Sequence, residues 1–223
     1  MLARLLSFAP LQRLTIRAFH TLWYNAETTW KRNTFAGHRI LQCPLDLQLY
    51  QEVICRVRPD FIVQTGVAGG GSLLYFATLF DLLEAPESAV VIGVDTALTE
   101  EARRLRHRRV RMIEGNSVDS TTLKAVRALA PLDSGFVSLD SSHATAHVAA
   151  ELLAYRDFVR VGSFLVVEDT NINGHPVAPG CGEDPLRAVA AFLKSDDRFV
   201  SDDELWRRNL FSFHQGGWLR RIK

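Results

Sequence analysis

Apolar and polar residues alternate in blocks through the middle of the chain. Short apolar runs predict five buried strands, at residues 60–66, 89–95, 110–115, 135–140 and 162–169. Segments with helical spacing of apolar residues lie between them, at 71–84, 99–107, 119–130 and 143–159. Strands and helices that alternate in this way predict an α/β fold with a doubly wound, mostly parallel sheet covered by helices on both faces.

The C-terminal region has a different pattern. Residues 184–193 predict a helix with Asp184 as its cap and Pro185 in its first turn. Residues 210–222 resemble two strands joined at Gln215–Gly217, and we expect this antiparallel hairpin to close the sheet. The long loop at 170–183 follows an acidic strand end and is a candidate lid.

The N-terminal segment is basic and amphipathic. Residues 1–26 contain no acid, and the leucines recur at near-helical spacing among Arg4, Arg13 and Arg17. We expect a helix that packs on the domain or on another subunit, so that the protein is a homo-oligomer. An organelle transit peptide and a membrane-surface helix are alternatives. We expect residues 1–56 to form a helical extension or cap, and residues 57–223 to form the domain that contains the sheet.

Composition and charge exclude several classes of protein. Lys plus Arg is 26 and Asp plus Glu is 25, which gives no support to bulk electrostatic binding of nucleic acid. The three cysteines predict neither a disulfide framework nor a structural zinc site. No apolar run is long enough to span a membrane. We therefore expect a cytoplasmic protein with a small-molecule partner.

The predicted strand ends carry the candidate chemistry, because ligands of open α/β sheets bind beyond the carboxyl ends of the strands. A glycine turn follows the first strand, and Asp95 ends the second one. A carboxylate there can accept hydrogen bonds from both ribose hydroxyls, so the pair favours a nucleoside-containing cofactor over a tight crossover with a solvated acid. The candidate cofactor-binding residues are Gln64, Thr65, Gly66, Gly70, Gly71, Ser72, Asp95, Asn116 and Ser117.

A second set of strand ends is acidic. Asp140, Glu168 and Asp169 end the fourth and fifth strands, which we expect to be neighbours. Carboxylates that converge repel one another unless a cation lies between them, and oxygen ligands suit Mg²⁺, Mn²⁺ or Ca²⁺. The alternative is a helix cap at Asp140 and a turn acid at Asp169.

His143 is the candidate general base, with Asp140 as its catalytic partner. His147 follows one helical turn later, and we expect it on the helix surface. The spacing of the two histidines is that of a zinc pair, but the intervening Glu of the HExxH motif is missing.

An ordered set of segments resembles the cephalosporin hydroxylase family. The segments are Thr29-Trp30 with Asn33-Thr34, CPLDLQLYQEVI (43–54), RPDFIVQTGVAGGGSLLYFA (58–77), VIGVD (91–95), IEGNS (113–117), LDSSHATAHVAAEL (139–152), VVEDT (166–170) and FHQGGWLRR (213–221). The family consists of class I S-adenosylmethionine-dependent methyltransferases with a Rossmann-like sheet. One departure is Gln64, where the family usually has an acid.

The resemblance implies that the glycine turn and Asp95 hold S-adenosylmethionine, and that Asp140, Glu168 and Asp169 bind Mg²⁺ near the acceptor. We therefore expect an O-methyltransferase that acts on a hydroxyl of a small natural product or sugar, as in antibiotic biosynthesis. Two alternatives remain: a hydroxylase or other oxidoreductase of a natural product, and a degenerate cofactor-binding subunit, which Gln64 suggests.

Overall fold

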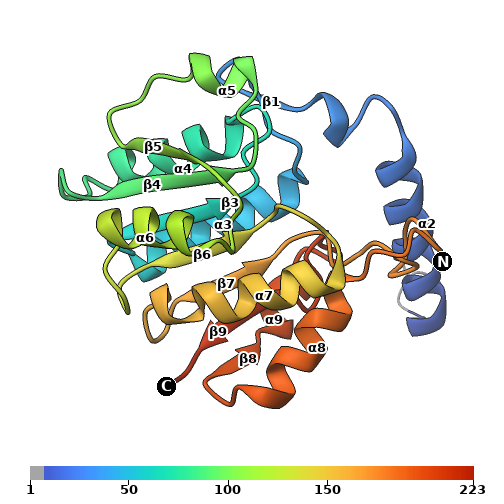
Figure 1. The fold of residues 1–223 in the computed structure, drawn as a ribbon. Helices are drawn as coiled ribbons and strands as arrows, with labels where there is room; N and C mark the ends of the chain where they lie inside the picture. The colour runs from blue at the N-terminus through green and yellow to red at the C-terminus, as the bar shows by residue number, and fades with distance from the viewer. Residues whose placement is uncertain (1–7) are drawn as a thin grey trace.

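A seven-stranded sheet forms the centre of the molecule, which the computed structural model describes for residues 8–223 (Figure 1). The strand order is β5-β4-β3-β6-β7-β9-β8, so the chain leaves β3 in one direction and returns to place β6 on its other side. The switch point of the topology therefore lies between β3 and β6. All five predicted strands are confirmed as parallel neighbours: β3 (Phe61–Thr65), β4 (Val90–Asp95), β5 (Val110–Glu114), β6 (Phe136–Leu139) and β7 (Phe164–Val167).

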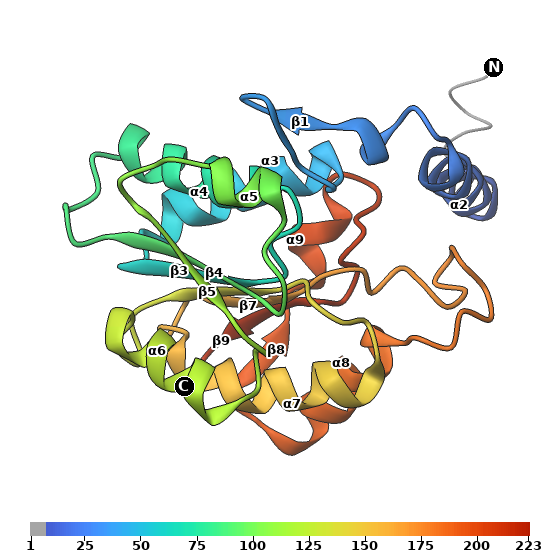
Figure 2. The ribbon, with the colours of Figure 1, turned by 45° about the horizontal axis from the view of Figure 1, so that its top comes forward.

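Helices cover both faces of this sheet (Figure 2). Alternate side chains of β3 point to opposite faces, so that Phe61 and Val63 enter one core and Ile62 enters the other. The first core is closed by α6 (Ser120–Leu129), α7 (Thr145–Tyr155) and α8 (Pro185–Ser195). The second is closed by α3 (Pro44–Val57), α4 (Gly71–Leu82), α5 (Glu100–Arg104) and α9 (Asp203–Arg207). The predicted helix at 143–159 is α7 followed by the short 3₁₀ helix η2 (Arg156–Phe158).

The sheet closes with antiparallel strands, as predicted, but the predicted strand pair is wrong. β9 (Trp218–Arg221) pairs with β7 and with β8 (Phe199–Ser201), and α9 lies between β8 and β9 in the chain. Residues 210–217 form no strand. The physical reason is that the backbone N–H of Phe213 donates to the buried Asp46 carboxylate, at 2.8 Å, instead of to a neighbouring strand.

The N-terminal region forms an arm beside the sheet domain (Figures 1 and 2). The predicted amphipathic helix is confirmed as α2 (Ala9–Asn25), while Leu2, Arg4, Leu5 and Leu6 lie outside the described residues. Its inner side packs on Phe211 and Phe213. The 3₁₀ helix η1 (Trp30–Arg32) and the short strands β1 (Thr34–Phe35) and β2 (His38–Arg39) lead from the arm to α3.

The outer side of α2 exposes Leu14 and Leu22. A subunit contact there, and the division of the chain near residue 56, stay predictions. Of the helices within residues 8–223, none has both the length and the apolar character that crossing a bilayer requires.

Candidate active site

Two cavities adjoin at the carboxyl edge of the sheet, beside the switch point. One has a volume of about 200 Å³ and is lined by the ends of β4 and β5 and by α7. The other has a volume of about 190 Å³ and lies between the β3 turn and the segment that follows β2. Gly66, Asp95 and Ser141 line both cavities, so the two form adjacent parts of one binding region.

Gly66 lies where the two halves of the sheet edge touch. Its φ is +78°, and a Cβ there would come within 1.9 Å of the backbone oxygen of Asp140. Only glycine allows this conformation and this close approach. Thr65, which is fully buried, accepts a backbone hydrogen bond from Asp140 at 3.0 Å. Thr65 and Gly66 therefore fix the end of β3 against the end of β6.

The other glycines of the turn serve the packing of the turn itself. Gly70 is the N-cap residue of α4, with a φ of +81°, and faces Leu105 of the segment after α5. A Cβ on Gly71 would come within 2.4 Å of the backbone oxygen of Arg39. Neither residue lines either of the two cavities described above, whereas the following Ser72 lines the 190 Å³ cavity. The predicted cofactor-binding residues thus fall into two groups: those that line a cavity and those that shape the turn.

Asp95 is held by backbone groups. Its Oδ2 accepts from the N–H of Val67 at 2.8 Å, and its Oδ1 accepts from the N–H of Ala97 at 3.1 Å. Each carboxylate oxygen has a further lone pair, and the residue lines both cavities. Asn116 and Ser117 line the 200 Å³ cavity beside it, so the structure brings these three predicted residues together.

Gln64 has an acceptor without a partner. Its Nε2 donates to the backbone oxygen of Gly66 at 2.7 Å, while its Oε1 is buried and has no hydrogen-bond partner within residues 8–223. The side chain lines the 190 Å³ cavity. A buried carbonyl oxygen costs free energy unless a donor reaches it, so a cationic amino group is a fitting ligand at this position.

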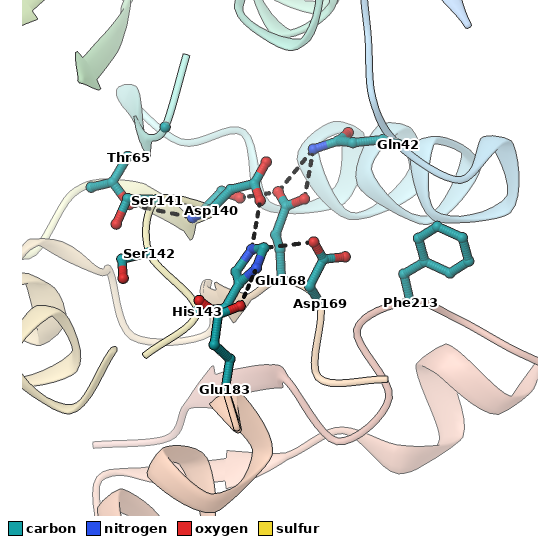
Figure 3. Close-up of polar contacts among 12 residues, drawn as sticks. Gln42, Thr65, Asp140, Ser141, Ser142, His143, Glu168, Asp169, Glu183 and Phe213 are labelled. Carbon is teal, nitrogen blue, oxygen red and sulfur yellow. Dashed lines mark hydrogen bonds and ion pairs between the residues drawn. The ribbon is translucent and has the colours of Figure 1, made fainter. Parts of the chain in front are cut away.

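The acidic strand ends converge as predicted, and His143 joins them (Figure 3). Ligand atoms of Asp140, His143 and Asp169 all lie within 4.8 Å of one another. The Nε2 of His143 is 3.2 Å from Asp169 and 4.0 Å from Asp140. From the long loop, Glu183 approaches the Nδ1 of the same ring at 3.8 Å, a contact that the sequence did not indicate.

Glu168 lies deeper than the other two acids. Its carboxylate accepts from Gln42 Nε2 at 2.9 and 2.7 Å, from the Tyr50 hydroxyl at 2.7 Å, and from Ser138. Its side chain also contacts Asp140, but it is not part of the 4.8 Å group. The sequence did not indicate Gln42 and Tyr50 as partners of Glu168, because they lie 126 and 118 positions before it. Tyr50 belongs to the quoted segment 43–54, but nothing in that segment points to this contact.

Burial and mutual repulsion disfavour charge on these acids. Burial, with the charge of Asp140 added, raises the pKa of Asp169 to about 7, and the pKa values of Asp140 and Glu168 are raised mainly by burial. The contact with Asp140 raises the pKa of His143 to about 9, with the charge of Asp169 adding to it. A site with several buried carboxyl groups and few cations fits a hard divalent cation with oxygen ligands.

The helical spacing predicts His147 on the helix surface, and this prediction is wrong. The residue lines the 200 Å³ cavity, and its Nε2 is 3.1 Å from the hydroxyl of Ser117. The reason is that Ser141 and Ser142, in the segment that joins β6 to α7, line the same cavity, so that the first turn of α7 faces it. Periodicity within a helix gives no information about a cavity at its end.

The fold and this site define the class of protein. Solved structures of CmcI share the architecture. The form described as apo is 23% identical and covers 86% of this chain and 76% of that one, with a TM-score of 0.63. The form described as Mg-SAM is 22% identical and covers 86% and 77%, with the same TM-score. The protein thus has the Rossmann-like fold of the methyltransferases.

The family follows from sequence. The model of the family "Rhamnosyl O-methyltransferase/CmcI" matches residues 27–222. The rhamnosyl O-methyltransferase of Mycobacterium tuberculosis H37Rv is 33% identical over 183 residues, which is 81% of this chain and 73% of the relative. That of Mycobacterium leprae is 29% identical over 202 residues, 89% and 87% of the two chains. The chain belongs to the rhamnosyl O-methyltransferase/CmcI family, which confirms the resemblance, and it is an enzyme of the methyltransferase class.

Proposed function

We propose that this protein transfers a methyl group from S-adenosylmethionine to a hydroxyl of a small natural product or sugar, with Mg²⁺ bound beside the acceptor. The observation that carries the proposal is the position of Asp140. The backbone of this residue abuts Gly66, which lines both cavities, and its carboxylate belongs to the acidic cluster. A donor in the cavities and an acceptor at the cluster would therefore be neighbours, which is the main requirement for methyl transfer.

The donor's parts match the cavity walls. Asp95 would accept hydrogen bonds from the ribose hydroxyls, while Asn116 and Ser117 would enclose the base. The unpartnered Oε1 of Gln64 would accept a hydrogen bond from the ammonium group. Where the family usually has an acid, this chain thus has a neutral acceptor. It would keep the hydrogen bond to the ammonium group but lose the electrostatic attraction between opposite charges.

The metal would be held by oxygen atoms of Asp140, Glu168 and Asp169. Gln42 and Tyr50 hold the Glu168 carboxylate in a fixed orientation. Bound Mg²⁺ supplies Lewis acidity that lowers the pKa of a coordinated hydroxyl, and S-adenosylmethionine supplies the electrophilic methyl group.

His143 would act as the base at the acceptor. Bound Mg²⁺ would offset the negative charge of Asp140 and Asp169 that raises the pKa of His143, so that the ring would be neutral and could accept the hydroxyl proton at Nε2. The cluster within residues 8–223 contains one histidine and two carboxylates. A facial triad of two histidines and one carboxylate would favour the oxidoreductase alternative, and this cluster does not supply it.

The acceptor class is supported by the relatives, which are named rhamnosyl O-methyltransferases. The test is calorimetry with S-adenosylmethionine, followed by transfer of a labelled methyl group to a panel of rhamnosylated and other hydroxylated acceptors, with Mg²⁺ or with EDTA. We expect binding of the donor and Mg²⁺-dependent transfer. Absence of donor binding, both with and without Mg²⁺, would contradict the proposal, and donor binding without transfer to any acceptor would favour the degenerate subunit.

A further inference from the structure

Helix α7 carries a carboxylate in the interior of the protein. Glu151 is fully buried in the middle of the helix, where a glutamate is rare unless its oxygens have partners. Its Oε1 accepts from the hydroxyl of Ser141 at 2.7 Å. Its Oε2 is buried and has no hydrogen-bond partner within residues 8–223. The packing of α7 alone does not explain this residue, because an apolar side chain would fill the position without the cost of burying a carboxylate.

One helical turn earlier, His147 faces the same carboxylate. Its Nε2 lies 3.6 Å from the Oε1 of Glu151 and 3.1 Å from the Oγ of Ser117. The Ser117 hydroxyl can donate or accept, so the carboxylate decides the tautomer of the imidazole: a hydrogen on Nε2 faces the lone pairs of Glu151, whereas the other tautomer would set a lone pair against them. The second nitrogen, Nδ1, then keeps its lone pair, and it has no partner in the described part of the chain.

The position of His147 indicates which ligand group would reach the Nδ1 lone pair. His147 and Ser117 line the 200 Å³ cavity together with Asp95. If Asp95 holds the ribose, the wall made by Ser117 and His147 is where the edge of the base lies. An acceptor on this wall selects a donor, and the 6-amino group is the donor that distinguishes adenine from hypoxanthine.

We propose that His147 is a specificity-determining residue whose Nδ1 accepts a hydrogen bond from the 6-amino group of the cofactor's adenine, and that Glu151 is the positioning residue that keeps the hydrogen on Nε2. The inference rests on the proposed function, because it assigns the base-binding end of the same cavity. It also gives the buried Glu151 a role, since its carboxylate connects Ser141, next to Asp140, with the far wall of the cavity.

The experiment compares S-adenosylhomocysteine with its deaminated analogue S-inosylhomocysteine, whose base has a carbonyl oxygen in place of the amino group. By calorimetry we expect the wild-type protein to bind the adenine compound at least about tenfold more tightly, because a carbonyl oxygen opposite the Nδ1 lone pair leaves both acceptors unsatisfied. His147→Ala should reduce the ratio of the two dissociation constants to less than about threefold, because the selecting group is gone.

The variant Glu151→Gln distinguishes the role of Glu151 in fixing the tautomer of His147 from its role in filling space. The amide keeps nearly the same volume. With its NH₂ group in the place of Oε1, it can donate to Nε2 of His147 and so allow the other tautomer, while the Ser141 hydroxyl changes from donor to acceptor. The ratio should fall in this variant as well, whereas Glu204→Gln, at an exposed position on α9, should keep the wild-type ratio. The ¹⁵N shifts of His147 in the wild-type protein report the tautomer without any substitution, and we expect the hydrogen on Nε2.

The outcomes distinguish the two proposals. A wild-type protein that binds neither compound would overturn the proposed function itself. A wild-type protein that binds both equally, a ratio unchanged in His147→Ala, or a hydrogen on Nδ1 would overturn the role of His147 and leave the proposed function standing. If the ratio falls in His147→Ala but not in Glu151→Gln, the positioning role of Glu151 is wrong.

Discussion

The strand ends of β3 and β4 and those of β6 and β7 meet at one edge of the sheet, but they are built differently. On the first side, Asp95 is held by backbone N–H groups of Val67 and Ala97. On the second side, Glu168 is held by side chains of Gln42 and Tyr50 from the region before the sheet. Backbone donors come with any turn of the right shape, whereas side-chain donors need particular residues at distant positions.

The two sides also differ in charge. Three carboxyl groups lie together on the β6–β7 side, and burial raises the pKa of each. Such a cluster is costly without a cation, so it suits the reacting side of a metal-dependent site. On the β3–β4 side a single acid faces the cavities, which suits the holding of a cofactor. The comparison predicts that changes on one side leave the function of the other side intact.

The largest effect is expected for Asp169→Asn. The amide keeps the size of the side chain but is a poor ligand for Mg²⁺, so turnover should fall by at least about a hundredfold. The affinity for S-adenosylhomocysteine should change little, because Asp169 lines neither cavity. Steady-state kinetics and calorimetry measure the two quantities. Asp197→Asn, at an exposed position, is the matched control. Unchanged turnover would remove Asp169 from the site.

Asp95→Asn is the counterpart on the other side. Loss of the charged acceptor should weaken binding of S-adenosylhomocysteine by about ten- to a hundredfold, because hydrogen bonds to an ionised group are the strong ones. The affinity for Mg²⁺ should stay as in the wild-type protein. Calorimetry with each ligand separately tests this, with the exposed Asp119→Asn as control. If Mg²⁺ binding fell and cofactor binding survived, the division between the two sides would be wrong.

Gln42→Leu tests the distant support of the acidic side. It removes a donor to both oxygens of Glu168, so the carboxylate loses its fixed orientation. We expect the affinity for Mg²⁺ to fall about tenfold or more, as is typical for residues that orient a metal ligand. Gln48→Leu, on the exposed side of α3, should have no such effect. An equal loss in both variants would indicate a general disturbance of α3 and the segment before it, and not a specific role of Gln42.

The smallest expected effect is on the pH dependence of stability. It concerns the packing of α2 on Phe211 and Phe213. His20 packs between Phe211 and Phe213 and contacts Asn171, and burial lowers its pKa from 6.5 to about 4. Between pH 6.5 and pH 4, His20 is therefore neutral in the folded protein but takes up a proton in the unfolded chain. Its contribution to stability is complete above pH 6.5 and is lost as the pH falls towards 4.

The variant His20→Phe keeps the aromatic packing and removes the titration. Urea unfolding at a series of pH values should show a smaller loss of the free energy of unfolding between pH 6.5 and pH 4 than in the wild-type protein. The difference should be on the order of 1–3 kcal/mol. Identical pH profiles for the two proteins would show that His20 does not couple protonation to folding.

Most of the sheet could be predicted because each strand is an apolar run with its own boundaries. The error at residues 210–222 has the opposite cause: alternation and a Gly-Gly pair are typical of a hairpin, but Asp46, far away in the chain, takes the backbone hydrogen bond of Phe213. The same holds for His147, which helical spacing places on a surface and the adjoining strand ends place in a cavity.

The sequence by itself determined the parallel sheet, its order of elements, and the set of acids and turn residues at the strand ends, because these depend on local patterns and on the rule that parallel strands end at one edge. Only the tertiary structure decided how these residues are held. Gln42 and Tyr50 at Glu168, Glu183 at His143, and Glu151 behind His147 come from elements brought together by packing. Hydrogen bonds to buried charges depend on distances of a few ångströms between remote segments, and no local pattern in the chain records them.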